Sequence, residues 1–430
     1  MAPSKDRLNE VSVSVVGVSS PAELAEKLAS LSREKAATTA IIEGILGGAL
    51  GLGASDIHFE PSRDIVKLRM RVDGILREAG TLSNEEYKYI LSRIKLLGGI
   101  KLNISEMAQD GRFTIRSREN ARDIEVRVSV NPSEYGATVV LRVLDPDAVV
   151  LKMEDLGLRA DDFERVSKNL KKPNGMILVT GPTGSGKTTT LYAFINSISS
   201  PEIKIITIED PIEYHLEGIQ QTQVDASAGY DFGNGLRSIL RQDPDVILVG
   251  EIRDAETAGI AVQAALTGHI VFSTLHTNTA AGAIPRLLDL EVKPHAVGPS
   301  VNAILAQRLV RKLCPKCRKE VEISEEYKEK IAKFTSSLPE RVILPEIKLY
   351  EPVGCPSCID GYKGRIGIFE VFEMDSDIEQ LVHEESSEVE IEENISKKGF
   401  VNMQQDGIIK ALMGITGLDE VEKTTGPLSW

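Results

Sequence analysis

The feature that most constrains this chain is Gly181-Pro-Thr-Gly-Ser-Gly-Lys187-Thr188, which matches the pattern G-x-x-x-x-G-K-[ST] at every fixed position. An apolar run, Met176–Thr180, precedes it, and a helical stretch, Thr188–Ile195, follows it. Glycines let successive backbone N–H groups wrap around phosphates, and the N-terminus of the next helix adds positive potential. The pattern therefore predicts a strand, a phosphate-binding loop and a helix, in that order.

Each residue type in this loop has a use in nucleotide binding. The ammonium group of Lys187 would reach the β- and γ-phosphates, and the hydroxyl of Thr188 would ligate Mg²⁺. The predicted ligands are therefore ATP and Mg²⁺. We expect the nucleotide to be bound by Gly181, Pro182, Thr183, Gly184, Ser185, Gly186, Lys187, Thr188 and Thr189.

Short apolar runs alternate with helical segments in this part of the chain. Runs of this kind suit strands that are buried on both faces of a parallel sheet. Helices between such strands indicate the α/β layer architecture. The predicted strands are Met176–Thr180, Lys204–Ile208, Val246–Val249 and Ile270–Ser273.

Two acidic residues follow predicted strands. Glu209 comes directly after Lys204–Ile208, and Glu251 follows Val246–Val249 closely. Ligands bind at the carboxyl ends of strands in open α/β sheets, and hydrolysis needs a carboxylate near the metal and a group that orients water. We expect Glu251 near Mg²⁺ and either glutamate as the group that activates water.

Two histidines flank the fourth predicted strand. His269 precedes it, within Thr267-Gly-His269, and His276 follows it. Polar groups at the end of this strand are candidates for sensing the γ-phosphate. We therefore include His276 among the catalytic candidates and His269 among the nucleotide-binding ones.

The four cysteines of the chain occur as two C-x-x-C pairs, at Cys314/Cys317 and Cys355/Cys358. In a cytosolic protein this spacing favours metal binding over disulfides. Four thiolates form a closed tetrahedral zinc site with no open position, so we expect structural Zn²⁺. Free or redox-active thiols are the alternative.

The chain of 430 residues is long enough for two or three domains. The net charge is -14, and residues 373–393 hold ten acidic residues and no Lys or Arg. A broadly basic surface for nucleic acid is therefore not expected.

No apolar run reaches the length of a membrane span, and residues 1–20 make a poor signal peptide. We expect a cytoplasmic protein.

The N-terminal third has a different pattern. A capping box at Ser20–Glu23 predicts a helix, and Thr39–Leu52 predicts a second one. Partly alternating runs of β-branched residues then predict strands, with a helix at about 85–97. The expected organisation is a helical extension over 1–38, a small α+β domain over 39–146, a linker over 147–158, and the ATPase domain over 159–430. Within that last domain, a zinc module is expected at about 310–370, with helices after it.

Together these motifs resemble the type II secretion and type IV pilus assembly ATPases. The motifs that carry the resemblance are the phosphate-binding loop, the aspartate box Thr207–Tyr214, the Walker B segment Asp245–Asp254, the histidine box Thr267–His276, and the N-terminal tracts Ala54–Pro61 and Gln109–Arg112. The resemblance implies a RecA-like P-loop core, a PAS-like N-terminal domain and a zinc module with four cysteine ligands.

The resemblance also implies an assembly and a role. Members of this family form homohexamers at the cytoplasmic face of the inner membrane, where they act on a platform protein and dock on a membrane-anchored partner. By analogy, Arg127 with Arg142, and Arg237 with Arg241, would close on the phosphates. Members with the zinc module power pilus extension or protein export rather than retraction. Glu209 is the favoured water activator, and no nucleic acid is expected as a partner.

Two other classes of protein remain open from the residues. A DNA translocase or helicase could use the same core, with the zinc module binding nucleic acid. A regulatory module could bind ATP without hydrolysing it, although the presence of both Glu209 and Glu251 argues against this.

Overall fold

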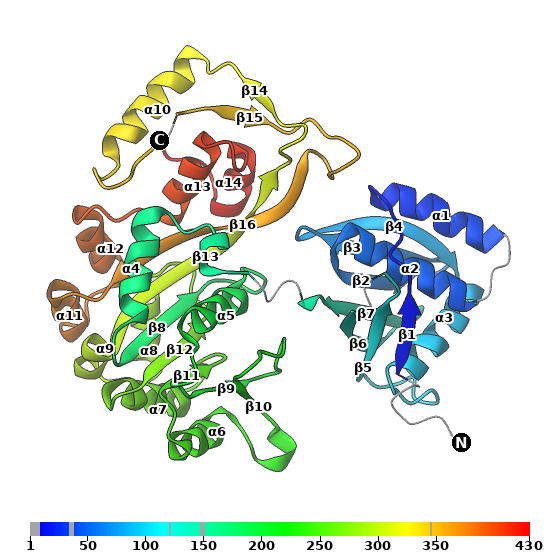
Figure 1. Ribbon diagram of the computed structural model, residues 1–430, viewed down its shortest axis with the longest axis horizontal. Helices are drawn as coiled ribbons and strands as arrows, with labels where there is room; N and C mark the ends of the chain where they lie inside the picture. The colour runs from blue at the N-terminus through cyan, green and yellow to red at the C-terminus, as the bar shows by residue number, and fades with distance from the viewer. Residues whose placement is uncertain (1–8, 34–37, 120–121, 147–150, 345) are drawn as a thin grey trace. The chain divides into compact units, whose positions relative to one another are not determined.

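The computed structural model describes residues 9–33, 38–119, 122–146, 151–344 and 346–430 (Figure 1). The chain forms two compact units. The N-terminal unit comprises residues 1–148 with 353–363, and the C-terminal unit comprises 149–352 with 364–430. Parts of the predicted extension (1–8 and 34–37) and of the predicted linker (147–150) lie outside the described residues.

The N-terminal unit contains a seven-stranded sheet in the order β1-β5-β6-β7-β2-β3-β4. Its strands are β1 (Glu10–Val13), β2 (Ala54–Pro61), β3 (Ile65–Val72), β4 (Ile75–Ser83), β5 (Gln109–Ser117), β6 (Asp123–Ser133) and β7 (Gly136–Leu144). Its helices are α1 (Pro21–Arg33), α2 (Thr38–Leu52) and α3 (Asn84–Leu97).

Buried and more exposed side chains alternate along these strands, and the buried ones form the core of the N-terminal unit. In β3, for example, Val66, Leu68, Met70 and Val72 are buried, whereas the residues between them are half-buried or exposed. The buried side chains pack with apolar residues of α1, α2 and α3 in a single cluster. A sheet that packs helices on one face keeps polar residues on the other, and this second face carries Arg112, Arg127 and Arg142.

The strand β1 is a feature that the sequence pattern did not predict. It lies in the segment expected to be a helical extension, and it pairs in parallel with β5. Val11 and Val13 of β1 are buried in the core of the N-terminal unit. The predicted capping group is also present, since the Ser20 hydroxyl accepts a hydrogen bond from the backbone N–H of Glu23.

The C-terminal unit is an α/β structure around a second seven-stranded sheet, in the order β10-β9-β11-β12-β8-β13-β16. Its strands are β8 (Gly175–Thr180), β9 (Ile205–Glu209), β10 (Gln220–Gln223), β11 (Val246–Val249), β12 (Ile270–Leu275), β13 (Val301–Leu313) and β16 (Tyr362–Glu373). The pairs from β10 to β13 are all parallel. The predicted α/β class with a parallel sheet is confirmed.

Helices cover both faces of this sheet. One face packs against α4 (Ala160–Leu170) and α5 (Lys187–Ile198). The other packs mainly against α6 (Phe232–Ile239), α7 (Ala255–Leu266), α8 (Ala283–Asp289) and α9 (Pro294–Ser300), with α11 (Ser376–His383) and α12 (Glu388–Lys397) joining them. Strands enclosed in this way are apolar along their whole length, which explains the continuous runs in the sequence.

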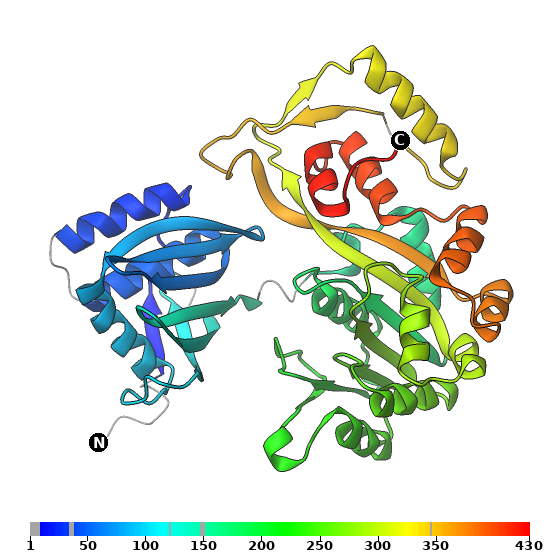
Figure 2. The same ribbon diagram turned by 180° about the vertical axis from the view of Figure 1, so that it is seen from behind.

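The remaining elements form an arm at one end of the C-terminal unit, visible from behind in Figure 2. They are β14 (Lys319–Val321), α10 (Glu325–Ser337), β15 (Leu349–Glu351), α13 (Met403–Leu412) and α14 (Leu418–Thr425). Phe334 of α10 packs in a small core with Ile408 of α13 and Val421 of α14. Trp430 stands edge-on to Phe334 and Tyr327, so the chain end closes this core. None of the described helices is long and apolar enough to cross a membrane.

Candidate active site

The P-loop connects the end of β8 at Thr180 to the start of α5 at Lys187. Gly181, Gly184 and Gly186 have φ values of 144°, 79° and 88°, which L-residues with a side chain adopt rarely. A Cβ at Gly181 would lie 2.4 Å from the carbonyl oxygen of Gln307 on β13. Glycine is therefore required there, and the loop can follow the path that exposes its N–H groups to a phosphate.

Lys187 lies over this loop. Its ammonium group donates hydrogen bonds to the carbonyl oxygens of Gly181 (2.8 Å) and Pro182 (3.2 Å). Burial lowers the pKa of Lys187, and the carboxylate of Glu251 acts in the opposite direction. A cation that is partly desolvated beside a glycine cradle fits the charge and shape of a nucleotide's phosphates.

Glu251 lies just after β11, at the same edge of the sheet as the P-loop. Its Oε1 forms an ion pair with Arg253, and its Oε2 lies 3.0 Å from Nε2 of His276. Arg253 also lies 3.6 Å from Asp210. Burial acts to raise the pKa of Glu251, but hydrogen bonds from Arg253 and His276 outweigh it and lower the pKa. Glu251 is thus an ionised carboxylate at neutral pH, as a magnesium ligand must be.

Glu209, the last residue of β9, is only 3% exposed. Its Oε2 accepts a hydrogen bond from the hydroxyl of Tyr192 on α5. Its Oε1 accepts from the hydroxyl of Thr207 (2.6 Å) and from Nε2 of Gln221 on β10 (3.1 Å). The sequence predicts an acid at this strand end, but the structure adds that the acid is enclosed and fixed by three donors.

The loop after β12 joins the same edge of the sheet. Thr277 exchanges hydrogen bonds with Thr180, the last residue of β8. His276 is about half exposed and contacts Glu251. The structure therefore brings Lys187, Glu209, Glu251 and His276 to the carboxyl ends of four adjacent strands.

His269 lies elsewhere. It precedes β12, and β12 pairs in parallel with β8 so that Ile270 is opposite Gly175 and Leu275 is opposite Thr180. The P-loop follows Thr180, whereas His269 lies at the start of these strands. Its Nδ1 is 3.0 Å from the carbonyl oxygen of Ala264. His269 is thus separated from the P-loop of its own chain by the length of β8, and its expected contact with nucleotide is not formed within one chain.

The C-terminal arginine pair also lies outside this cluster. Arg237 of α6 forms an ion pair with Glu256, and Arg241 is exposed on the short 3-10 turn that follows, Leu240–Gln242. Both side chains are exposed, and Arg237 contacts α7 rather than the P-loop.

The N-terminal arginines lie side by side on the polar face of their sheet. Arg127 is directly opposite Arg142 on β7 and opposite Arg112 on β5. Arg142 pairs with Asp56 (3.1 Å), and Arg127 lies 3.9 Å from Glu125. Like charges directly opposite one another destabilise a sheet, so this row is better suited to binding an anion than to stabilising the unit.

The four cysteine sulfurs lie within 4.8 Å of one another. Sγ of Cys355 is 3.7 Å from Sγ of Cys358. Four thiols without another type of donor fit tetrahedral Zn²⁺ best. The spacing of the two C-x-x-C pairs thus predicted a cluster that the fold brings together.

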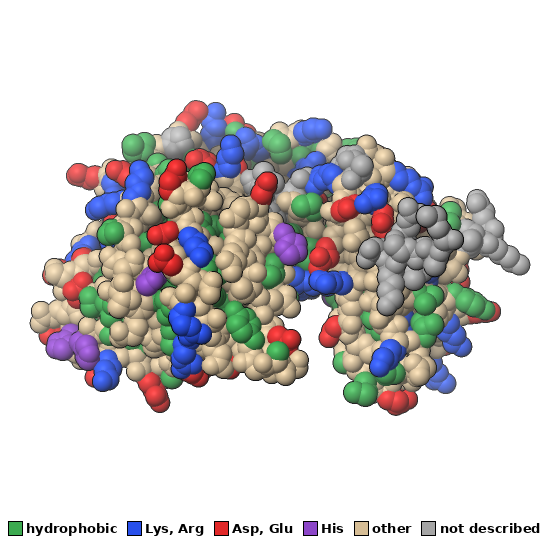
Figure 3. Space-filling model, turned by 60° about the horizontal axis from the view of Figure 1, so that its bottom comes forward, with side chains coloured by type: hydrophobic (Ala, Val, Ile, Leu, Met, Phe, Trp, Pro, Cys, Tyr) green, Lys and Arg blue, Asp and Glu red, His purple; other side chains and the backbone are tan. Residues whose placement is uncertain are grey.

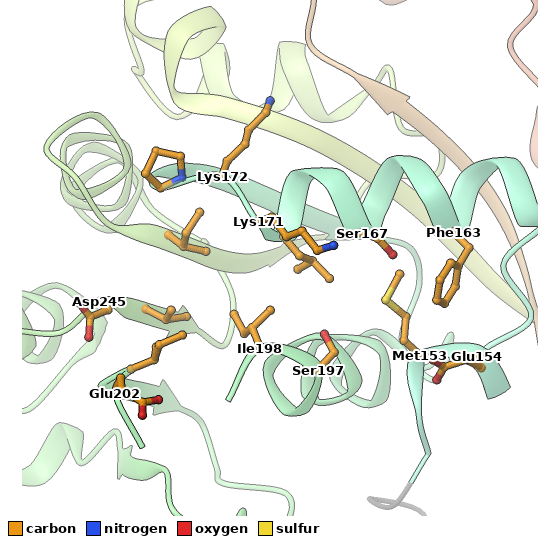
Figure 4. Close-up of a pocket in the computed structure, with 15 residues that line it drawn as sticks. Met153, Glu154, Phe163, Ser167, Lys171, Lys172, Ser197, Ile198, Glu202 and Asp245 are labelled. Atoms are coloured by element: carbon orange, nitrogen blue, oxygen red, sulfur yellow. The ribbon is translucent and has the colours of Figure 1, made fainter. Parts of the chain in front are cut away.

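A pocket of about 590 Å³ lies at the other edge of the C-terminal sheet (Figure 4). Met153, Phe163 and Ile198 line it, together with Val246 and Ile270 at the beginnings of β11 and β12. These are the amino ends of the strands, whereas the P-loop lies at their carboxyl ends. The pocket is therefore not the phosphate site.

Sequence reasoning missed three residues of the site. Arg253 lies within the Walker B segment, and its charge next to Glu251 is the signal that could have identified it. Tyr192 and Gln221 carry weaker signals. Tyr192 is a buried polar group in an otherwise apolar stretch of α5, and only the packing of α5 on β9 shows what its hydroxyl contacts.

Comparison with known proteins gives consistent relatives. The type II secretion system ATPase E of Vibrio cholerae is 44% identical over 395 residues, which cover 92% of this chain and 76% of the relative. The type IV pilus assembly ATPase PilB of Pseudomonas aeruginosa is 42% identical over 418 residues, covering 97% of this chain and 73% of the relative.

Solved structures agree at the level of the fold. The pilus retraction motor PilT with bound ADP has a TM-score of 0.59 at 26% identity. The match covers 88% of this chain and 95% of the PilT chain. The ATPase DotB of Legionella pneumophila has a TM-score of 0.64 at 22% identity, covering 89% and 95% respectively. A family model described as type II/IV secretion system protein matches residues 32–423. The chain is therefore a member of the type II/IV secretion system protein family.

Proposed function

We propose that this protein hydrolyses ATP and couples the reaction to pilus extension or protein export. The observation that carries the proposal is the meeting of the P-loop, Glu251 and Glu209 at one edge of a parallel sheet. The relatives named above, which are ATPases of type II secretion and type IV pilus assembly, support it.

Each residue of the site has a separate role in the proposed reaction. The backbone N–H groups of the P-loop and Lys187 would bind the phosphates, while Thr188 and Glu251 would hold Mg²⁺. When bound, Mg²⁺ neutralises charge on the transferring phosphoryl group. Glu209 would orient the attacking water, because its carboxylate is fixed in place. His276, through its contact with Glu251, would respond to the loss of the γ-phosphate.

We further propose that the active protein is a homohexamer at the cytoplasmic face of the inner membrane, where it acts on a platform protein and docks on a membrane-anchored partner. Arg127 and Arg142, and Arg237 and Arg241, would then complete the site of a neighbouring subunit. The exposed position of Arg237 and Arg241, away from their own P-loop, supports supply in trans. Zn²⁺ at the four cysteines would be structural.

A DNA translocase is the second candidate on this core. On the face of the described chain in Figure 3, Lys and Arg side chains are interspersed with Asp and Glu, which does not favour binding to a polyanion. The names of the relatives also favour secretion over nucleic acid.

The test is phosphate release by the purified protein, with and without DNA. Lys187→Ala removes the only loop cation that would neutralise the β- and γ-phosphates, so we expect turnover to fall to background. Slow turnover by the unmodified chain that is indifferent to DNA would support the proposal.

Two outcomes would contradict it. Near-normal turnover by Lys187→Ala would reject the site, and stimulation by DNA of several-fold would favour the translocase. Lys204→Ala is the matched control, because Lys204 donates to the carbonyl of Gln242 and lies at the other edge of the sheet. It is expected to keep its turnover.

A further inference from the structure

Glu209 is held by donors from three different elements. The hydroxyl of Tyr192 comes from α5, that of Thr207 from β9 itself, and the amide of Gln221 from β10. All the donors are side chains, and the carboxylate is 3% exposed. An ionised carboxylate has about four acceptor sites. The described contacts fill two on Oε1 and one on Oε2, so one site on Oε2 stays open.

We propose that Tyr192 is a positioning residue for hydrolysis: its hydroxyl fixes Oε2 of Glu209 so that the remaining acceptor site is available to the attacking water. This inference rests on the proposed function, because it assigns a positioning partner to the group that we expect to orient water. Thr207 and Gln221 bind the other oxygen, so Tyr192 is the donor that restricts Oε2.

The position of Tyr192 on α5 connects Glu209 to the P-loop through one helix. Lys187, the first residue of α5, belongs to the P-loop, and Tyr192 follows five residues later in the same helix. The side chain of Tyr192 is 1% exposed and packs in the core between α5 and the sheet. One rigid element thereby sets the position of Glu209 relative to the group that binds phosphate. Catalytic geometry of this kind requires support from buried neighbours.

The hydroxyl of Tyr192 keeps its proton at neutral pH. Burial raises the pKa of Tyr192, and the carboxylates of Glu209 and Glu213 raise it further. A protonated phenol is a donor, and hydrogen bonds to an ionised group are stronger than those between neutral groups. Tyr192 therefore donates to Oε2 of Glu209 and holds the carboxylate in one orientation.

Steady-state ATP hydrolysis by Tyr192→Phe tests the proposal. The substitution removes one oxygen and keeps the ring, so we expect the melting temperature to stay close to that of the unmodified chain. Because an oriented carboxylate matters in the transition state rather than in ATP binding, kcat should fall by about tenfold while KM stays within about twofold. Tyr230→Phe is the matched control, since it removes a hydroxyl that contacts Thr222 at 3.3 Å instead of Glu209.

A double-mutant cycle distinguishes positioning from a general packing effect. If Tyr192 acts through the carboxylate, Tyr192→Phe should cause no further loss in a Glu209→Gln background. An equal loss in both backgrounds, or unchanged kcat in Tyr192→Phe, would overturn the inference. Near-normal turnover by Glu209→Gln would instead reject the role of Glu209 in the proposed function, so the two failures can be told apart.

Discussion

At the scale of single residues, the balance between burial and hydrogen bonding determines which acids carry charge. Glu251 is paired with Arg253 and His276, and its pKa is lowered. Glu370 of β16 is 6% exposed, and it accepts hydrogen bonds from the backbone N–H groups of Ala280 and Met403. Burial raises the pKa of Glu370 to about 7, an effect that these two hydrogen bonds only partly oppose. Glu370 therefore links the loop after His276 to α13. The free-energy cost of burying its carboxylate depends on pH.

This cost predicts a pH dependence of stability. Between pH 4.5, the ordinary pKa of Glu370, and about pH 7, the folded chain binds this proton and the unfolded chain does not. Its contribution to the free energy of unfolding should therefore decrease as pH rises through this window, by up to about 3 kcal/mol, and then level off. Urea unfolding from pH 4.5 to 8 measures it.

Glu370→Gln should remove this part of the pH dependence, because the amide does not titrate. Glu388→Gln, at a nearby hydroxyl contact with Thr279, is the matched control and should keep the pH dependence of the unmodified chain. Parallel stability curves for the unmodified chain and Glu370→Gln would contradict the assignment.

At the scale of elements, buried charges attach the arm of the C-terminal unit to the sheet. Arg159, just before α4, lies 3.1 Å from Asp406 of α13 and also pairs with Asp162. Lys410 of α13 pairs with Asp406 and donates to the carbonyl of Gly367 on β16 at 2.8 Å. Breaking one partner of a buried pair is costly because it leaves an uncompensated charge. These contacts therefore connect α13 to the start of α4 and to β16.

The cysteine cluster belongs to the same scale and gives a prediction on metal removal. Elemental analysis of freshly prepared, reduced protein should find one Zn²⁺ per chain, because four thiolates close a single site. A strong chelator should lower the melting temperature, and added Zn²⁺ should restore it. Metal content near zero would refute the site.

Cys355→Ser is the variant that tests this cluster, and Ser357→Ala is the control from the same turn. The first should lose metal, and the second should retain it. ATP turnover by the Zn²⁺-free chain would fall only through loss of folding, since a site with four protein ligands has no open position for water or substrate.

At the scale of the whole molecule, the central question is where the arginines act. The row on β5, β6 and β7 carries three directly opposed arginines, of which Arg142 is 55% exposed although it pairs with Asp56. Our proposal places Arg142 over the nucleotide of a neighbouring subunit. If Arg142 acts in trans, the copy of the chain that supplies Arg142 is different from the copy whose P-loop binds the nucleotide.

Mixing two inactive variants tests this. Lys187→Ala chains lack a working P-loop but retain Arg142, and Arg142→Ala chains have the reverse defect. If Arg142 acts in trans, mixed assemblies should regain a fraction of the turnover of the unmodified chain, measured as phosphate release at equal total protein. Mixing Lys187→Ala with the double variant, Lys187→Ala plus Arg142→Ala, is the control and should stay inactive. No recovery in the first mixture would contradict supply in trans.

The sequence by itself determined the parts whose signals are local. The P-loop pattern predicted a nucleotide site at the carboxyl ends of the strands. The apolar runs predicted the α/β class with a parallel sheet, and the two C-x-x-C pairs predicted the cysteine cluster. These features depend on backbone conformation and on burial on both faces, which neighbouring residues specify. The strand ends carrying Glu209, Glu251 and His276 could be predicted for the same reason.

Only the tertiary structure decided which side chains meet. It enclosed Glu209 among Tyr192, Thr207 and Gln221, placed His269 at the opposite end of β12 from the P-loop, and added β1 to the N-terminal sheet. It also aligned Arg112, Arg127 and Arg142, since strand register brings together residues 15 positions apart. Contacts of this kind depend on the packing of distant elements, for which no short stretch of sequence carries a signal.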